Sequence, residues 1–230
     1  MSEIKLGIIG GGQLGSMLSE AARKLNIKTI IYCDDPNAPA KNFCDVFICA
    51  EYNNKDKIYE FAKKVDVITY EFENIPYETL NELNKLKPVK PKPSVNRLIQ
   101  HRLAEKDFIN KLNIRTTRYV QVENKEDLLP LNDFLPGILK TTTLGYDGKG
   151  QYPIKKMDEI NSLNINFDNE YILEKLVRLK KEISVVLTRF DNHKYEIYEP
   201  IENFHNEQIL RHSKIPAEIS EKIFEQSKEW

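Results

Sequence analysis

Short apolar runs alternate with segments of helical periodicity over the first part of the chain. The runs at 4–9, 28–32, 45–49 and 65–69 are mostly apolar, which is typical of strands buried on both faces of a parallel sheet. Between them, segments such as 54–64 repeat apolar residues at the spacing of one helix face. This pattern predicts an α/β unit with a parallel sheet.

A proline–lysine stretch follows at residues 85–93 and cannot form a helix. After it, Ser94 is a good N-cap for a helix predicted over 96–113. We interpret the stretch as the join between two domains, which assigns residues 1–95 to the first domain and 96–230 to the second.

The second part of the chain changes to a mixed, mainly antiparallel pattern. Asp191 and Asn192 mark a hairpin between two of its expected strands. Expected strands lie at 116–122, 134–139, 151–156, 171–177, within 179–187 and at 194–200, with a short helical turn at 125–128 and a last helix within 216–230.

The first strand leads into a glycine-rich turn, Gly10-Gly-Gly-Gln-Leu-Gly15, which matches G-x-G-x-x-G. A helix and a second strand ending at Asp34-Asp35 follow, and this context is that of a nucleotide-binding fingerprint. On pattern alone the ligand would be NAD. The same turn can also seat the helix close to the sheet and present N–H groups to any anion. Asp34 and Asp35 equally suit a turn before Pro36.

A second glycine-rich stretch runs from Lys140 to Gln151 between two expected strands. Its glycines leave backbone N–H groups free to turn towards an anion, and Lys140 and Lys149 add positive charge. A polyphosphate would suit such a loop. The stretch is not a Walker A loop, because it lacks G-x-x-x-x-G-K-[ST] and precedes a strand. The alternative is an ordinary hairpin tip.

Charged residues outside the glycine turns can each be interpreted as functional or as structural. Glu71 and Glu73 follow a predicted parallel strand, at the sheet edge where ligands bind in open α/β sheets. They could instead be a charged strand end that caps the next helix. Arg102 and Lys106 lie four apart on one side of a predicted helix, which is usually solvated surface.

The overall composition excludes several classes of partner. The chain has 34 Lys and Arg against 35 Asp and Glu, a net charge of −1, so no basic surplus favours nucleic acid. No segment has the length of apolar residues needed to span a membrane, and no secretory leader is recognisable. Cys33, Cys44 and Cys49 lack metal or disulfide spacing, so buried thiols in a reducing cytoplasm are expected.

Four stretches together resemble the ATP-grasp superfamily and, within it, the 5-(carboxyamino)imidazole ribonucleotide synthases of purine biosynthesis. The resemblance implies an α/β fold in which a Rossmann-like, pre-ATP-grasp parallel sheet precedes an incomplete α+β ATP-grasp domain. That domain would hold a lid subdomain at about 116–177 and the start of a C-terminal subdomain at 178–230. The four stretches are Gly10–Gly15, Thr69–Pro76, Gly145–Gln151 and Glu199–His205 with Ile209–Arg211.

The resemblance also implies roles for matching positions. Tyr146 and Asp147 would face bicarbonate or carboxyphosphate as catalytic residues. The 5-aminoimidazole ribonucleotide would lie against Gln13, Leu14, Glu71 and, as a weaker addition, Glu73. Without the resemblance, His205 and Glu182 would be read as an ordinary histidine and a solvated acid. The implied ATP contacts are Arg102, Lys140, Gly145, Tyr146, Asp147, Gly148, Lys149, Gly150, Gln151, Glu174, Lys175, Leu176, Val177, Glu182 and His205.

The implied reaction is ATP-dependent carboxylation of 5-aminoimidazole ribonucleotide with bicarbonate, through carboxyphosphate, with Mg²⁺ bridging the phosphates. The resemblance therefore demotes NAD, because the first domain of such enzymes holds the sugar-phosphate substrate. The four histidines, His101, His193, His205 and His212, also form no evident set for an NAD-dependent oxidoreductase.

The chain departs from the family in one respect. The family's metal-binding acids are expected beyond Trp230, so none is assigned here. A second hypothesis is therefore a catalytically inactive, truncated ATP-binding fragment, or half of a split enzyme that pairs with a separately encoded C-terminal half. A homodimer is also expected from the family, and the expected location is the cytoplasm.

Overall fold

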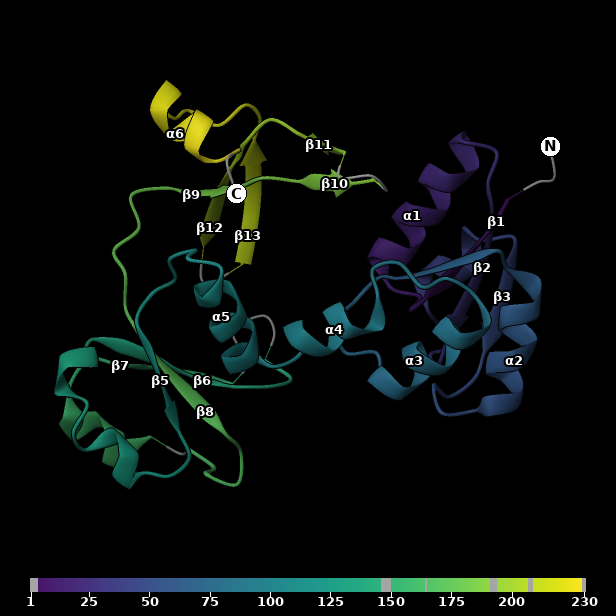
Figure 1. Ribbon diagram of the computed structural model, residues 1–230. Coiled ribbons are helices and arrows are strands. Elements are labelled where there is room, and N and C mark those ends of the chain that lie inside the picture. The colour runs from purple at the N-terminus through teal and green to yellow at the C-terminus, as the bar shows by residue number, and fades with distance from the viewer. Residues whose placement is uncertain (1–3, 146–149, 164, 191–193, 207–208, 229–230) are drawn as a thin grey trace. The chain divides into compact units, whose positions relative to one another are not determined.

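The computed structural model of the protein describes residues 4–145, 150–163, 165–190, 194–206 and 209–228 (Figure 1). The chain divides into two compact units, Met1–Glu105 and Lys106–Trp230. The division falls inside a helix, ten residues after the join expected at 95/96. The domain boundaries given above stay a prediction.

The first unit is built on a parallel sheet of four strands in the order β3-β2-β1-β4. Parallel neighbours require crossover connections, and helical segments lie in these connections. The sheet confirms the expectation from the four apolar runs. Its strands are β1 (Lys5–Ile9), β2 (Lys28–Cys33), β3 (Val46–Cys49) and β4 (Val67–Tyr70).

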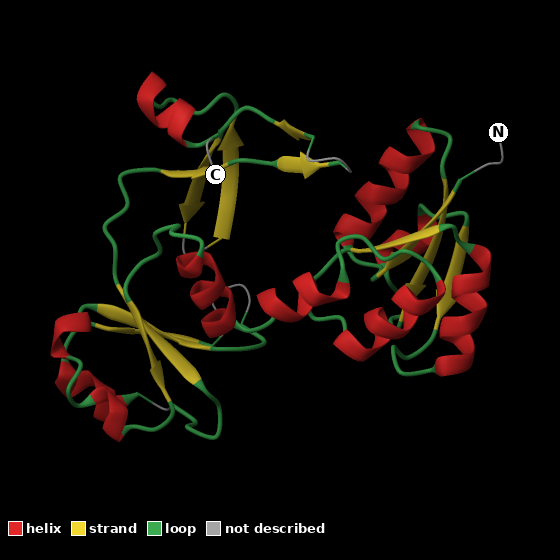
Figure 2. Ribbon diagram, in the orientation of Figure 1, coloured by secondary structure: helices red, strands yellow, loops and turns green. Residues whose placement is uncertain are grey.

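Both faces of this sheet are covered, which explains why its strands are apolar throughout. Ile8 and Ile31 pack on one face, in a cluster with Ala40. Ile9 and Tyr32 point to the opposite face, because side chains alternate along a strand, and join a larger core. Figure 2 shows the helices (red) around this sheet. The elements are α1 (Gln13–Lys24), the 3₁₀ helix η1 (Pro39–Asn42), α2 (Lys55–Lys64) and α3 (Tyr77–Leu86).

The single helix predicted over 96–113 is wrong, because two helices occupy this region. They are α4 (Pro93–Ile99) and α5 (Arg102–Lys111). His101 Nδ1 accepts the N–H of Ala104, so the imidazole caps a new helix where the old one ends. Ser94 is not the N-cap of α4 either; Lys92 is, because a proline suits the first helical position.

The second unit begins with an antiparallel sheet of four strands in the order β5-β8-β6-β7. One face buries Leu139, Leu173 and Val122 against three short 3₁₀ helices. The elements are β5 (Tyr119–Val122), η2 (Glu126–Leu128), η3 (Asn132–Phe134), β6 (Gly137–Thr141), β7 (Gln151–Ile154), η4 (Met157–Ser162) and β8 (Tyr171–Lys175).

The rest of the second unit holds two small antiparallel sheets, β13-β12-β9 and β10-β11. The single strand expected within 179–187 is corrected to two strands in different sheets, whereas β12 and β13 had not been predicted. Asp191 and Asn192 lie outside the described residues. The elements are β9 (Glu182–Ser184), β10 (Leu187–Arg189), β11 (Tyr195–Ile197), β12 (Ile201–Asn206), β13 (Ile209–Lys214) and α6 (Glu221–Gln226).

The predicted fold class is therefore confirmed: an α/β unit with a parallel sheet precedes a part dominated by antiparallel sheets. Among the described residues, no helix has the length and apolar character needed to cross a membrane.

Phe61 tests the core of the first unit. Its side chain is fully buried on α2 and lies edge-on to Tyr32, with ring centroids 5.6 Å apart. Phe61→Ala should lower the free energy of unfolding of this unit by about 3–5 kcal/mol, because it leaves a cavity. Tyr59→Ala on the same helix is the control, since Tyr59 is 47% exposed and its loss should cost about 1 kcal/mol or less. Urea unfolding of both variants measures this, and equal costs would contradict the packing described.

Candidate functional site

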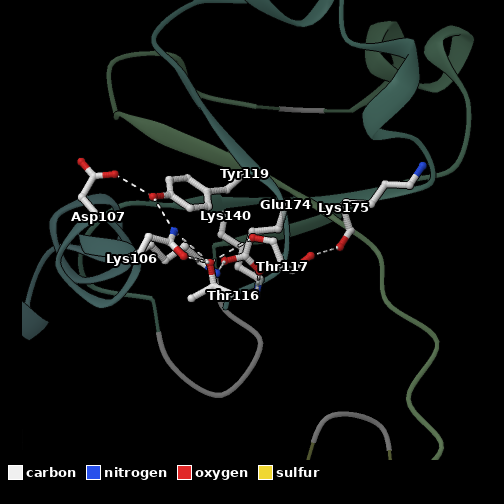
Figure 3. Close-up of polar contacts among 9 residues, drawn as sticks. Lys106, Asp107, Thr116, Thr117, Tyr119, Lys140, Glu174 and Lys175 are labelled. Carbon is white, nitrogen blue, oxygen red and sulfur yellow. Dashed lines mark hydrogen bonds and ion pairs between the residues drawn. The ribbon is translucent and has the colours of Figure 1, made fainter. Parts of the chain in front are cut away.

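A lysine–carboxylate cluster lies on the sheet face opposite the core of the second unit (Figure 3). Glu174 on β8 pairs in register with Ile138 on β6, two residues before Lys140. Because alternate residues share a face, the side chains of Lys140 and Glu174 project from the same side as diagonal neighbours. Lys106 reaches this point from α5.

The distances in the cluster are those of charge-assisted hydrogen bonds. Lys140 Nζ lies 2.7 Å from Glu174 Oε2, and Lys106 Nζ lies 3.0 Å from Glu174 Oε1. The exposed fractions of the side chains are 18% for Lys140, 16% for Lys106 and 10% for Glu174. Each carboxylate oxygen therefore holds one ammonium group in a largely buried position.

Tyr119 fixes the position of Lys106. Its ring lies 5.4 Å from Lys106 Nζ, at cation–π distance, and Tyr119 pairs with Glu174 across β5 and β8. The Tyr119 hydroxyl donates to Asp107 Oδ1 at 2.7 Å and accepts from Asn110 Nδ2 at 3.0 Å. The ring is thus held from α5, the same helix that carries Lys106.

The cluster carries two positive charges against one negative charge. Burial acts to raise the pKa of the Glu174 carboxyl, but hydrogen bonds and charges from Lys140 and Lys106 outweigh burial and lower that pKa below its ordinary value. Glu174 is therefore ionised at neutral pH. The net charge of about +1 makes the cluster a suitable place for an anion.

The glycine hairpin begins directly beside this cluster. Lys140 pairs with Gln151, and the N–H of Thr141 donates to the carbonyl of Gly150. Gly150 has a φ of +67°, and a Cβ there would lie 2.6 Å from Thr141 Oγ1, so a side chain is excluded at this position. Gly145 begins the glycine-rich part, and residues 146–149 (Tyr146, Asp147, Gly148 and Lys149) lie outside the described residues.

The end of β8 is anchored by its neighbours. Lys175 Nζ donates to the carbonyls of Asp133 and Leu135, and the N–H of Leu176 donates to that of Pro136. The side chains of Leu176 and Val177 are nevertheless exposed. This leaves two apolar side chains within three positions of Glu174.

Glu182 and His205 come together in a separate pocket of about 270 Å³. His205 Nδ1 lies 3.5 Å from Glu182 Oε1, while Lys181 and Glu202 form an ion pair at 2.8 Å. The pocket is lined by Leu179, Lys180, Lys181, Glu182, Glu202, Asn203, Phe204 and His205.

In the first unit, the Glu71 carboxylate lies on the first glycine turn. The N–H of Gly12 donates to Glu71 Oε1 at 2.9 Å. Gly10 has a φ of +99°, and a Cβ at Gly10 would lie 2.5 Å from Glu71 Cγ. Gln13 and Leu14 follow as exposed residues at the start of α1, and Glu73 is half-buried. The turn therefore already donates an N–H to a carboxylate.

The acids after β2 behave as turn formers. Asp35 Oδ1 accepts the N–H of Asn37 at 2.8 Å, an Asx turn. This local bond supports the interpretation of Asp34-Asp35 as turn-forming residues and not as contacts to a ribose.

The structure corrects the interpretation of Lys106 as solvated surface. The spacing of Arg102 and Lys106 gave no sign of Glu174, which lies 68 residues away in sequence. Tyr119 and Asp107 were likewise not singled out, and only the tertiary fold joins them to the cluster. Arg102 is the first residue of α5 and belongs to the first unit.

The residues that the structure describes contain no group of three or more His, Cys, Asp or Glu side chains arranged to hold a metal ion. In the cluster, Glu174 is paired with two lysines, and Asp107 accepts from the Tyr119 hydroxyl. No metal ligand is therefore assigned.

Comparison with protein families matches both units. Residues 3–100 match the ribonucleotide synthetase preATP-grasp domain, and residues 107–230 match the ATP-grasp domain. An N5-carboxyaminoimidazole ribonucleotide synthase of Brucella melitensis is 38% identical over 94% of this chain and 61% of its own length. The bifunctional purine synthesis protein purC/E of Dictyostelium discoideum is 36% identical over 97% of this chain and 23% of its own length.

Solved structures give the same result. An N5-carboxyaminoimidazole ribonucleotide synthetase in complex with ADP has a TM-score of 0.91 at 35% identity, over 99% of this chain and 62% of its own. The enzyme of Aspergillus clavatus with ADP and 5-aminoimidazole ribonucleotide has a TM-score of 0.86 at 25% identity, over 99% and 61%. The chain thus spans about three fifths of the length of the synthases it matches.

Glu174→Gln tests the cluster. The substitution keeps the shape but leaves two half-buried ammonium groups without their counter-charge, so unfolding should become easier by about 2–4 kcal/mol at pH 7. Because the folded-state pKa of Glu174 is lowered, its stabilisation is present above the ordinary carboxyl pKa and is lost as pH falls through the folded-state value.

The difference in stability between the parent protein and Glu174→Gln should therefore shrink at acidic pH. Thermal unfolding between pH 7 and pH 3 measures it. Glu126→Gln, at an exposed acid on η2 of the same unit, is the control. A difference that stays constant over this pH range would contradict the ionised carboxylate.

Proposed function

The chain belongs to the ATP-grasp family, and on that premise we propose that it acts in the ATP-dependent carboxylation of 5-aminoimidazole ribonucleotide in purine biosynthesis. The relatives named above support this substrate and reaction class. The observation that carries the proposal is the half-buried pair of lysines on Glu174 beside the glycine hairpin.

The cluster suits the phosphates of ATP. Lys140 and Lys106 present ammonium groups that Glu174 and Tyr119 hold in place before a ligand arrives. Such preorganised donors stabilise the charge of a transferring phosphoryl group without reorganising during the reaction. We assign Lys106 to this site in addition to Lys140, Arg102 and the hairpin residues 145–151.

The base and ribose of ATP are assigned to apolar and polar groups near the end of β8. Leu176 and Val177 offer exposed apolar surface after Glu174 and Lys175. Glu182 and His205 supply polar groups in the pocket that they share. These assignments follow the family resemblance, and the exposure of the two apolar side chains supports them.

The first glycine turn is assigned to the amine end of the ribonucleotide, with Gln13, Leu14, Glu71 and Glu73. Glu71 occupies the N–H of Gly12 and places negative charge where a dinucleotide would place its pyrophosphate. A carboxylate in this position favours an amine and repels a phosphate. The alternative of an NAD-dependent oxidoreductase therefore loses its main support.

The proposed chemistry has two displacements. An oxygen of bicarbonate attacks the γ-phosphorus of ATP, the bond to ADP breaks, and carboxyphosphate forms. The amine nitrogen then attacks the carboxyl carbon, the bond to phosphate breaks, and the nitrogen loses a proton. Tyr146 and Asp147 are proposed to face the carboxyl group, in a loop that excludes water. Mg²⁺ is proposed to accompany ATP and neutralise its phosphate charge.

A second candidate is an ATP-binding fragment that acts with another polypeptide, such as a separately encoded C-terminal half or a second copy. The observation in its favour is β13, which is exposed at all six of its residues and includes Ile209 and Leu210. Apolar surface of this kind commonly marks a contact with another protein. For either candidate we propose a cytoplasmic setting, which the free thiols of Cys33, Cys44 and Cys49 support. The expectation that these thiols are buried is correct only for Cys33, because Cys44 is half-buried and Cys49 is exposed.

Neutralising either cluster lysine should weaken nucleotide binding. Lys140→Met and Lys106→Met each remove a charge-assisted contact to phosphate, so the Kd for ATP should rise about tenfold to a hundredfold. Lys111→Met, on the exposed end of α5, is the matched control and should change the Kd less than about twofold. Calorimetric titration with Mg·ATP measures this. An unchanged Kd in Lys106→Met would remove Lys106 from the site.

The reaction itself is tested by phosphate release from ATP with Mg²⁺, bicarbonate and 5-aminoimidazole ribonucleotide. Release should require the ribonucleotide and fall in Asp147→Ala, because this aspartate is assigned to the carboxyl-transfer step. ATP, but not NAD, should raise the melting temperature. An ATP-stabilised chain without turnover would favour the second candidate, whereas stabilisation by NAD alone would overturn both.

A further inference from the structure

The segment between β4 and α3 carries both acids of the first unit's site but has no helix or strand of its own. Residues 71–75 form turns and bends, and all but Ile75 are half-buried. Backbone carbonyls in such a segment cannot rely on a ladder of hydrogen bonds and need other partners. The partners of this segment therefore determine where Glu71 and Glu73 lie.

Gln100, the C-cap residue directly after α4, supplies two of these partners. Its Nε2 donates to the carbonyl of Glu73 at 2.6 Å and to the carbonyl of Ile75 at 2.7 Å. Both hydrogens of one amide nitrogen are thus used on carbonyls two residues apart. The backbone from Glu73 to Ile75 is held at both ends by a single side chain.

Asn96, one turn earlier on α4, strengthens the same contact. Its Nδ2 donates to the carbonyl of Ile75 at 3.3 Å. Asn96 is fully buried, and its Oδ1 has no hydrogen-bond partner among the described residues. Asn96 and Gln100 therefore both donate to the carbonyl of Ile75.

The other end of the segment is held by the sheet. The N–H of Glu71 donates to the carbonyl of Ile9 at 3.1 Å, and its carboxylate accepts from Gly12. The segment is therefore fixed at Glu71 by β1 and the glycine turn, and at Glu73 and Ile75 by α4. Gln100 is half-buried, whereas Asn96 is fully buried, so Gln100 can be substituted with less disturbance of the core.

We propose that Gln100 is a positioning residue for the segment that carries Glu71 and Glu73, and through this segment for the amine end of the ribonucleotide. The ligand assignment rests on the proposed function; the positioning of the segment does not. Because Gln100 contacts only carbonyls of the segment in the hydrogen bonds described, it acts through the acids and not on the ligand.

A donor series at Gln100 tests this role. Gln100→Glu keeps the shape but replaces the donor by a carboxylate that repels both carbonyls. Gln100→Lys restores a nitrogen with enough hydrogens for both carbonyls. Gln121→Glu is the matched control, since Gln121 is an exposed amide on β5. Hydrogen exchange of the backbone amides at 70–78 reports on the segment, and titration with 5-aminoimidazole ribonucleotide reports on the site.

In Gln100→Glu, exchange at 70–78 should become at least about tenfold faster and the affinity for the ribonucleotide should fall about tenfold, while exchange in β1, β2 and β3 stays unchanged. Gln100→Lys should recover most of both effects, and Gln121→Glu should show neither. Recovery of slow exchange and of ribonucleotide affinity in Gln100→Lys would distinguish a positioning role of Gln100 from a general loss of stability.

Two results would overturn the inference. Unchanged exchange at 70–78 in Gln100→Glu would show that the amide does not hold the segment. Faster exchange with undiminished ribonucleotide affinity would show that the segment does not position the ligand. If the parent protein itself binds no ribonucleotide, the proposed function fails, and hydrogen exchange alone decides whether Gln100 positions the acids.

Discussion

The candidate phosphate site depends on the ion pairs that the Glu174 carboxylate forms with two lysines. Lys106 and Lys140 are both largely buried, and each lies within 3.0 Å of one of its oxygens. Like charges held around one carboxylate repel each other, and this repulsion is stronger away from bulk water, so the two ammonium groups would be unfavourable together without this partner. The carboxylate allows them to lie together while leaving a net positive charge.

The same contact explains why a small antiparallel sheet can present a charged site opposite its core. One face of the sheet is closed by Leu139, Leu173 and their neighbours. The other face carries Lys140, Glu174 and Tyr119 at positions that alternate with those core residues. The alternation of side chains along a strand thus places the core residues on one face of the sheet and the charged residues on the other. A mutation on one face need not disturb the other face.

The sequence was informative where a local pattern determines the structure. Continuous apolar runs predicted a parallel sheet because strands covered on both faces need apolar residues at every position, as Ile8 and Ile9 show. Helical periodicity failed at residues 96–113, because a side-chain cap from His101 interrupts the helix without changing the apolar pattern. The short strands β12 and β13 were missed because they are largely exposed and lack a consistent apolar alternation.

The candidate site was only partly visible in the sequence for a related reason. Lys140 could be singled out because it adjoins a glycine-rich stretch, but Lys106 could not, because its partner Glu174 lies on a distant strand. Gln100 was likewise unremarkable, since its contacts to Glu73 and Ile75 cross 27 and 25 residues. Residues that act through tertiary contacts cannot be recognised from the local spacing of residue types in the sequence.

The two glycine-rich turns show how such contacts decide function. Glycine-rich turns can offer backbone N–H groups, which attract any acceptor. In the first turn the acceptor is Glu71, 59 residues away, and its negative charge disfavours a phosphate there. In the second, the neighbouring side chains are ammonium groups with a net positive charge, which favours one. A glycine motif therefore supplies donors, and the side chain that the fold places beside it selects the charge of the ligand. Under the proposed function, a turn with a dinucleotide-like pattern would therefore hold an amine-bearing substrate, and a hairpin without a Walker motif would hold ATP.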